Sequence, residues 1–145
     1  MMKVVSYAED VGYLMVSHLA RKILEAIYEN SVLTPTMIAK RKGYRVERKI
    51  RILFEKNGWR VIRAGGSLGE ADLVCLKRGK VIFLQIKSTK KDQLYYYGYR
   101  KSSLEGFPFY VVVDFGYGKI RILKPKRTIT KEDGEDLSFF LERFK

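Results

Sequence analysis

The sequence contains one cysteine, Cys75, and one histidine, His18, in 145 residues. A single cysteine excludes an internal disulfide, and these two residues are too few for a Cys/His zinc site. Catalysis of the Ser-His-Asp or Cys-His type would have to use His18, and a lone histidine in a helical stripe is more often a packed or surface residue. We therefore expect chemistry without thiol or imidazole, and a location in the reducing cytoplasm.

The sequence also lacks any run of about 18 uninterrupted apolar residues, the length that a membrane-spanning helix requires. Its first residues do not follow the order of a signal peptide, in which a charged start precedes an apolar stretch and a small-residue cleavage site. We expect no membrane partner.

Acidic residues are scarce, since 16 Asp and Glu stand against 29 Lys and Arg and give a formal net charge of +13. The excess is concentrated in residues 43–100, where fourteen basic residues oppose five acidic ones. So basic a chain repels itself, and the usual compensation is a polyanionic partner. Because 46% of the residues are hydrophobic, we expect a folded domain that binds DNA.

Apolar periodicity predicts helices and strands in alternation. Thr34 and Pro35 form a helix N-cap followed by proline at the first helical position, and Gly58 marks a helix end. We expect residues 1–40 to form a helical extension and residues 41–145 to form one domain. The predicted helices span 11–28, 46–57 and 137–144, and the predicted strands span 59–64, 71–76, 81–88, 109–115 and 119–123.

The segment FLQIKST, residues 83–89, places two polar side chains on one face of an otherwise apolar strand. Gln85 and Lys87 are two residues apart, so they point to the same side of the sheet. If residues 77–80 form the turn of a hairpin, Val74 faces Phe83 and Asp72 faces Gln85. The hairpin therefore predicts a carboxylate, an amide and an ammonium in one cluster.

Such a cluster suits metal-assisted hydrolysis of a phosphodiester. Oxygen ligands hold Mg²⁺, with Mn²⁺ as a substitute, and the cation neutralises charge in the transition state and activates water. Lys87 could orient that water or stabilise developing charge. The alternative is a modest salt bridge between Asp72 and Lys87 at the edge of a sheet.

The wider spacing resembles that of the archaeal Holliday junction resolvases, members of the PD-(D/E)xK nuclease superfamily. The resemblance runs from about Lys42 to Val113 and includes RKGYRVERKIRILFEKNGWRVIRAGGSLGEADLVCLKRGKVIFLQIKSTKKDQLY. It implies a restriction-endonuclease-like α/β fold, with a mixed central sheet flanked by helices. The activity it implies is Mg²⁺-dependent cutting of branched DNA, with the four-way junction as the expected substrate.

The resemblance also implies roles for individual residues. Asp72 would be a metal ligand, Lys87 would lie at the attacking water, and the carbonyl of Ile86 would complete the metal shell. Glu47, four residues after Gly43 on a helix, would bind the metal or a metal-bound water. Ser67 would contact the substrate phosphate, although it is equally compatible with a simple turn.

Gln85 departs from the family pattern, which has an acid at this position. An amide oxygen still binds hard cations but brings no charge, so metal affinity should fall. Glu70, two residues before Asp72, could supply the missing carboxylate. The other reading is a catalytically degenerate paralogue that only binds DNA.

A rival interpretation is a winged-helix DNA-binding protein. Ala39 and Gly43 have the spacing of a helix-turn-helix, whose second helix, around residues 45–57, would enter the major groove. Lys42 and Lys49 count against it, because they fall where that motif prefers apolar residues. A translation start near Met37 would also account for a leader that fits neither family.

Cutting two strands of a junction calls for two active sites, which predicts a C2 homodimer. Aromatic residues that could form its interface lie around the later hairpin and the last helix, and about half of them are expected to fill the core instead. These residues are Phe107, Phe109, Phe115, Tyr117, Phe139 and Phe140.

Overall fold

The computed structural model describes residues 18–24, 34–65 and 68–145. The chain divides into two compact units, residues 1–40 and 41–145. In the first unit, residues 18–24 are helical, and the rest of the helix predicted for 11–28 lies outside the described residues. The candidate site belongs to the second unit.

Helix α3 (Pro35–Lys56) is one continuous helix of 22 residues. Thr34 caps it as predicted, because its Oγ1 accepts a hydrogen bond from the amide of Met37 at 3.2 Å. Gly58 follows its end with a φ of +85°, a conformation that glycine adopts without strain. The helix packs on the sheet through a stripe of buried side chains, Val46, Ile50 and Phe54.

The winged-helix interpretation is wrong, because α3 passes through Gly43 without the turn that a helix-turn-helix needs. Lys49, which did not fit that motif, has a different role. Its Nζ lies 3.1 Å from Oδ2 of the buried Asp114, whose Oδ1 accepts a hydrogen bond from the amide of Gly116. The Lys49–Asp114 pair fastens α3 to the end of a central strand.

The central sheet is mixed, as predicted. Its strand order is β1-β2-β3-β6-β7-β9, with the short β5 paired to the first two residues of β6, and all pairs are antiparallel except β3 with β6. The strands are β1 (Arg60–Arg63), β2 (Leu73–Lys77), β3 (Lys80–Ser88), β5 (Ser103–Leu104), β6 (Phe107–Asp114), β7 (Ile120–Leu123) and β9 (Glu135–Asp136).

The predicted register of the β2–β3 hairpin is confirmed, since Val74 pairs with Phe83. The predicted four-residue turn is wrong, because Lys77 also pairs with Lys80 and only Arg78 and Gly79 remain in the turn. Both turn residues have positive φ, 48° and 79°, as two-residue hairpins favour. Extending both strands by one residue leaves the register unchanged.

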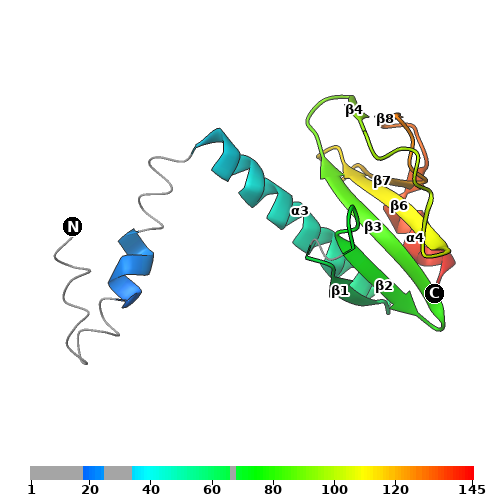
Figure 1. Ribbon diagram of the computed structural model, residues 1–145, viewed down its shortest axis with the longest axis horizontal. Helices are drawn as coiled ribbons and strands as arrows, with labels where there is room; N and C mark the ends of the chain where they lie inside the picture. The colour runs from blue at the N-terminus through cyan, green and yellow to red at the C-terminus, as the bar shows by residue number, and fades with distance from the viewer. Residues whose placement is uncertain (1–17, 25–33, 66–67) are drawn as a thin grey trace. The chain divides into compact units, whose positions relative to one another are not determined.

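Helices cover one face of this sheet. α3 and α4 (Leu137–Arg143) pack there over a shared apolar core, and Figure 1 shows both on the same side. A second sheet, β4 (Gln93–Tyr95) with β8 (Thr128–Thr130), covers part of the other face. There Tyr96 and Ile129 pack together with residues 111 and 113 of β6. The sheet is thus flanked by helices on one side and by a small sheet on the other.

None of the helices in the described residues is both long and apolar enough to cross a bilayer.

Candidate active site

Asp72 lies just before β2 and remains in the β2–β3 ladder, because its amide donates to the carbonyl of Leu84 at 2.8 Å. Its carboxylate oxygen Oδ2 accepts two hydrogen bonds, from the amide of Ile86 at 2.7 Å and from Nε2 of Gln85 at 3.0 Å. The predicted meeting of Asp72 and Gln85 is therefore present. The Ile86 amide, which the sequence did not single out, fixes the same carboxylate.

The surroundings of Asp72 work against its negative charge. Burial raises the pKa of this carboxyl group, and the negative charge of Glu47 raises it further. The hydrogen bond from Ile86 and the positive charge of Lys87 lower the pKa, but the net shift is upward. Glu47 and Lys87 are thus both close enough to act on Asp72, and a bound cation would relieve the repulsion between the two carboxylates.

Glu47 is held at the sheet by an arginine that the sequence did not indicate. Its Oε1 accepts a hydrogen bond from Nε of Arg63 on β1 at 2.6 Å, and this pairing raises the pKa of Arg63. The Arg63 guanidinium also lies over the ring of Tyr44, 5.5 Å from its centroid. One oxygen of Glu47 is therefore engaged by Arg63.

Lys87 is exposed on β3, and its side chain makes no hydrogen bond or ion pair with another residue in the described part of the chain. Its ammonium group remains available for a phosphate or a water molecule. Ser67, the other predicted contact to phosphate, lies outside the described residues.

Tyr96 adjoins the site, although the sequence did not mark it. Its side chain is 5% exposed, and its hydroxyl has no hydrogen-bond partner among the described residues. A Cβ on Gly98 would lie 2.5 Å from this hydroxyl and 2.9 Å from Oε2 of Glu70, so both groups crowd the same glycine. Burial, then the charges of Glu70 and Asp72, raises the pKa of Tyr96 to about 12. The phenol therefore stays protonated and can donate a hydrogen bond.

The oxygen donors at the site fit a hard divalent cation. No cluster of three or more His, Cys, Asp or Glu side chains suited to a metal exists in residues 18–24, 34–65 and 68–145. The hydrogen bonds described above leave Oδ1 of Asp72, one oxygen of Glu47 and the amide oxygen of Gln85 for a ligand. Mg²⁺ commonly takes one or two carboxylates and keeps several waters, so this donor set is sufficient.

The raised pKa of Asp72 leads to a prediction about stability. The folded state prefers this carboxyl protonated, so its ionisation destabilises the fold above its folded-state pKa. Asparagine keeps an oxygen acceptor without the charge, and Asp72→Asn should raise the melting temperature of the metal-free protein at pH 7 by roughly 2–4 °C. The gain should shrink as the pH falls through the Asp72 pKa, because the wild-type carboxyl then also becomes neutral.

Thermal unfolding in EDTA between pH 3 and pH 7 measures this difference. Asp92→Asn is the matched control, since the Asp92 side chain is 90% exposed and forms a surface ion pair with Lys131. The control should change the melting temperature little at any pH. An Asp72→Asn variant that is less stable than the wild type at pH 7 would contradict the account of this carboxylate.

A family model and a curated relative that match this chain are both Holliday junction resolvases. Residues 38–108 match the family model described as archaeal Holliday junction resolvase (hjc). Over 55 residues the chain is 40% identical to the crossover junction endodeoxyribonuclease Hjc of Methanocaldococcus jannaschii. That stretch covers 38% of this chain and 41% of the relative, which is less than half of the relative's length.

Two solved structures share the fold. The Holliday junction resolvase Hjc of Archaeoglobus fulgidus superposes with a TM-score of 0.56 at 18% identity, over 72% of this chain and 98% of that one. The bacterial homing endonuclease I-Ssp6803I gives a TM-score of 0.50 at 14% identity, over 77% of this chain and 94% of that one. The unit of residues 41–145 therefore has the restriction-endonuclease-like fold that the sequence predicted.

Proposed function

Because residues 38–108 match the family model of the archaeal Holliday junction resolvases, we propose that this protein is a Mg²⁺-dependent endonuclease that cuts branched DNA. The observation that carries the proposal is the fixed carboxylate of Asp72. It is held by the Ile86 amide and Gln85 within the electrostatic reach of Glu47 and Lys87. With a single cysteine, the protein would act in the reducing cytoplasm.

In this proposal Asp72, Glu47 and the amide oxygen of Gln85 hold Mg²⁺ or Mn²⁺, with the carbonyl of Ile86 as a further ligand. When bound, the cation would lower the pKa of the attacking water and neutralise negative charge on the phosphate. Lys87 stabilises the developing negative charge or orients the water, since its ammonium is exposed beside Asp72. Ser67 contributes a hydrogen bond to the substrate phosphate.

Gln85 gives the site one negative charge fewer than the family pattern. Its Nε2 donates to Asp72, so it orients the carboxylate that an acid at this position would repel. We propose that Glu70 makes up part of the missing charge, because its carboxylate lies at Gly98 beside Tyr96. The second candidate function is binding of branched DNA without cleavage, and the observation that favours it is the missing acid itself.

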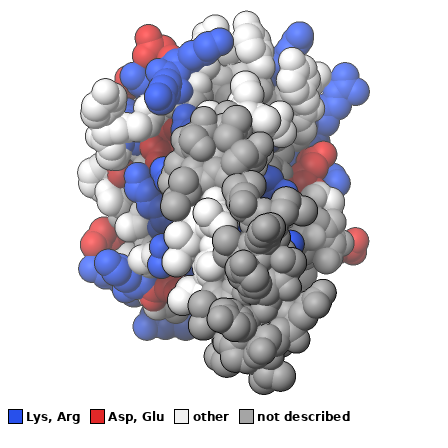
Figure 2. Space-filling view, turned by 90° about the vertical axis from the view of Figure 1, so that its left-hand side faces the viewer, with Lys and Arg blue, Asp and Glu red and all other residues white. Residues whose placement is uncertain are grey.

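DNA is the proposed partner because residues 43–100 carry a large excess of positive charge. On the described part of the face in Figure 2, Lys and Arg side chains are spread widely, with acidic side chains between them. The net charge of +13 would draw the protein to a polyanion and make its affinity fall with salt.

Incubation with a four-way junction and with a linear duplex of the same length tests the proposal. We expect cleavage of the junction in Mg²⁺, none in EDTA, and at least about tenfold less cleavage of the duplex. Equal cutting of both DNAs would refute the preference for branches. A junction that is bound but remains intact in Mg²⁺ would support the second candidate.

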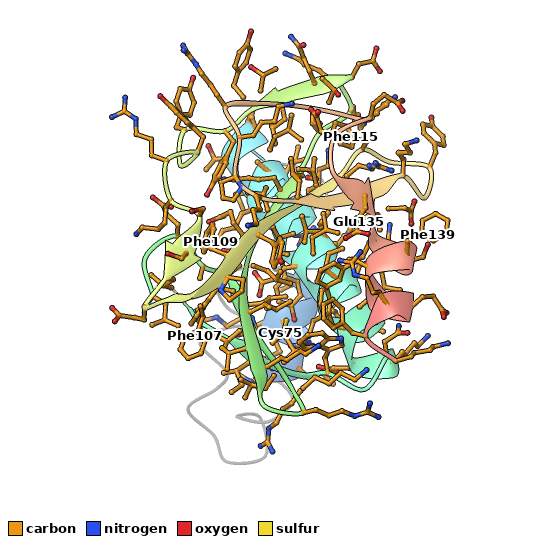
Figure 3. All side chains as sticks on the ribbon, turned by 90° about the vertical axis from the view of Figure 1, so that its right-hand side faces the viewer. Cys75, Phe107, Phe109, Phe115, Glu135 and Phe139 are labelled. Carbon is orange, nitrogen blue, oxygen red and sulfur yellow. The ribbon has the colours of Figure 1, made fainter. Side chains whose placement is uncertain are left out.

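We propose a homodimer, because resolving a junction requires two cuts and each subunit carries one candidate active site. Half of the candidate aromatics, Phe109, Phe115 and Phe140, are buried in the core. Phe107 and Phe139 are 43% and 70% exposed and lie on opposite sides of the molecule in Figure 3, so one patch does not contain both.

We assign the dimer contact to the patch around Phe107. Its ring lies 6.3 Å from that of Phe83, and the neighbouring Val74, Val81 and Leu104 are only partly buried. These side chains form an apolar cluster of their own, separate from the cluster that packs under the β4–β8 sheet, and Val74 lies two residues from Asp72.

Sedimentation equilibrium tests this contact with two matched variants. The wild type should be a dimer, Phe107→Ser should raise the dimer dissociation constant at least about tenfold, and Phe139→Ser should leave it unchanged. A monomeric wild type, or dissociation caused by Phe139→Ser alone, would exclude the Phe107 contact.

A further inference from the structure

Four tyrosines and one arginine form a hollow on the sheet face that carries Asp72. It has a volume of about 530 Å³ and is lined by Tyr95, Tyr96, Tyr97, Tyr99 and Arg127. We call it the tyrosine pocket. None of these five residues is acidic, and no role of the proposed active site uses them.

The pocket has a fixed wall. Tyr95 belongs to β4, which pairs with β8 through Thr128, and the amide of Tyr96 donates to the carbonyl of Arg127 at 2.8 Å. The ring of Tyr96 packs in the core cluster that includes Ile129. The backbone at Tyr95 and Tyr96 is therefore held by hydrogen bonds and by packing, so this wall of the pocket is formed before a ligand arrives.

Tyr96 joins the pocket to the proposed active site. Its buried hydroxyl crowds Gly98 beside Glu70, and the charges of Glu70 and Asp72 act on it. A strand whose phosphate lies at Asp72 would thus place an adjacent nucleotide near the tyrosines.

Two of the other tyrosines are exposed to solvent, whereas Tyr99 is partly buried against the core. Tyr97 is 92% exposed and Tyr95 is 59% exposed. The guanidinium of Arg100 lies 5.6 Å from the ring centre of Tyr99, so cationic charge borders the aromatic surface together with Arg127. Aromatic rings with adjacent cations suit a nucleobase and its phosphate, because every base has a face that stacks and a backbone that is anionic.

We propose that the tyrosine pocket binds an unpaired nucleobase next to the phosphate that is cut. A paired base stays stacked within its duplex, whereas an unpaired one leaves the stack at little cost and can enter the pocket. The inference rests on the proposed function and narrows its substrate. The favoured branch point carries unpaired nucleotides, as a flap or a junction with an open centre does.

Binding in EDTA tests the pocket separately from catalysis. Two four-way junctions of equal length are compared, one fully paired and one with two unpaired nucleotides at the branch, of which one is the fluorescent base 2-aminopurine. The wild type should bind the unpaired junction about tenfold more tightly and quench the fluorescence through stacking. Tyr97→Ala with Tyr95→Ala should remove both effects and leave the affinity for the paired junction unchanged.

Tyr117→Ala is the control, because Tyr117 is a fully exposed tyrosine that does not line the pocket. It should behave like the wild type. Equal binding of both junctions by the wild type, or an equal loss on both junctions in the double variant, would overturn the inference.

The same DNAs separate the two proposals. Cleavage in Mg²⁺ without any preference for unpaired bases would refute the pocket and leave the nuclease proposal standing. Fluorescence quenching that depends on the tyrosines, without cleavage in Mg²⁺, would refute the nuclease proposal and leave the pocket.

Discussion

Asp72→Asn should lower the rate of junction cleavage by roughly a thousandfold or more, while the affinity for the junction in EDTA stays within about threefold of the wild type. Asparagine retains an oxygen for the Ile86 amide but removes the charge that holds the cation. Lys87→Ala should produce a loss of similar size for a different reason, because it removes the ammonium that acts on Asp72 and would stabilise the transition state.

Single-turnover cleavage with saturating protein measures both losses without interference from binding. Lys90→Ala is the matched control for Lys87→Ala, since Lys90 is also exposed and lies just beyond β3. It should retain the wild-type rate within a factor of about three. Wild-type activity in Asp72→Asn would show that the hydrolytic site lies elsewhere.

Gln85→Glu should have the second largest effect, on the dependence on metal. The change replaces a hydrogen bond between Gln85 and Asp72 by two carboxylates that face each other. The added negative charge should lower the Mg²⁺ concentration for half-maximal cleavage by about tenfold, and in EDTA the same repulsion should lower the melting temperature. A lower Mg²⁺ requirement for cleavage, together with a lower melting temperature in EDTA, is expected only if residue 85 lies at a cation site.

Two variants complete this experiment. Glu70→Gln should raise the Mg²⁺ requirement if Glu70 compensates for the missing acid. Gln93→Glu adds the same charge on β4, where Gln93 is exposed, and should leave the Mg²⁺ requirement unchanged. If Gln85→Glu and Gln93→Glu have the same Mg²⁺ dependence as the wild type, the amide of Gln85 is not at the metal.

The local part of the site was predictable from the sequence. A tight hairpin fixes its register by the alternation of side chains, so Asp72 could be placed opposite Gln85 from the positions of Val74 and Phe83 alone. An error of two residues in the turn did no harm, because both strands lengthened equally. The hydrogen bond between Asp72 and Gln85 follows from that register.

The long-range part was not predictable in the same way. The contact between Glu47 and Arg63 depends on how α3 docks on the sheet, and strand periodicity gives no information about it. Strands β4 and β8 have three residues each, too few for a periodic pattern, and they pair across more than thirty residues of sequence. The run of tyrosines at residues 95–97 is plain in the sequence, but only the folded structure shows that Tyr96 lies at the site.

The helix α3 shows how packing overrides a local signal. Gly43 favours a break in a helix, and the sequence offered two helical segments around it. The Thr34 cap at one end and the buried stripe of Val46, Ile50 and Phe54 at the other hold a single helix through the glycine.

The most direct test of the central claim is to map the cuts in a four-way junction whose strands are labelled one at a time. A dimer with one Asp72 site in each subunit predicts two Mg²⁺-dependent nicks, in opposite strands and at positions related by the twofold axis, and none with Asp72→Asn. A junction that stays intact in Mg²⁺ while the wild-type protein binds it as tightly as Asp72→Asn does would contradict the claim that this protein cuts DNA.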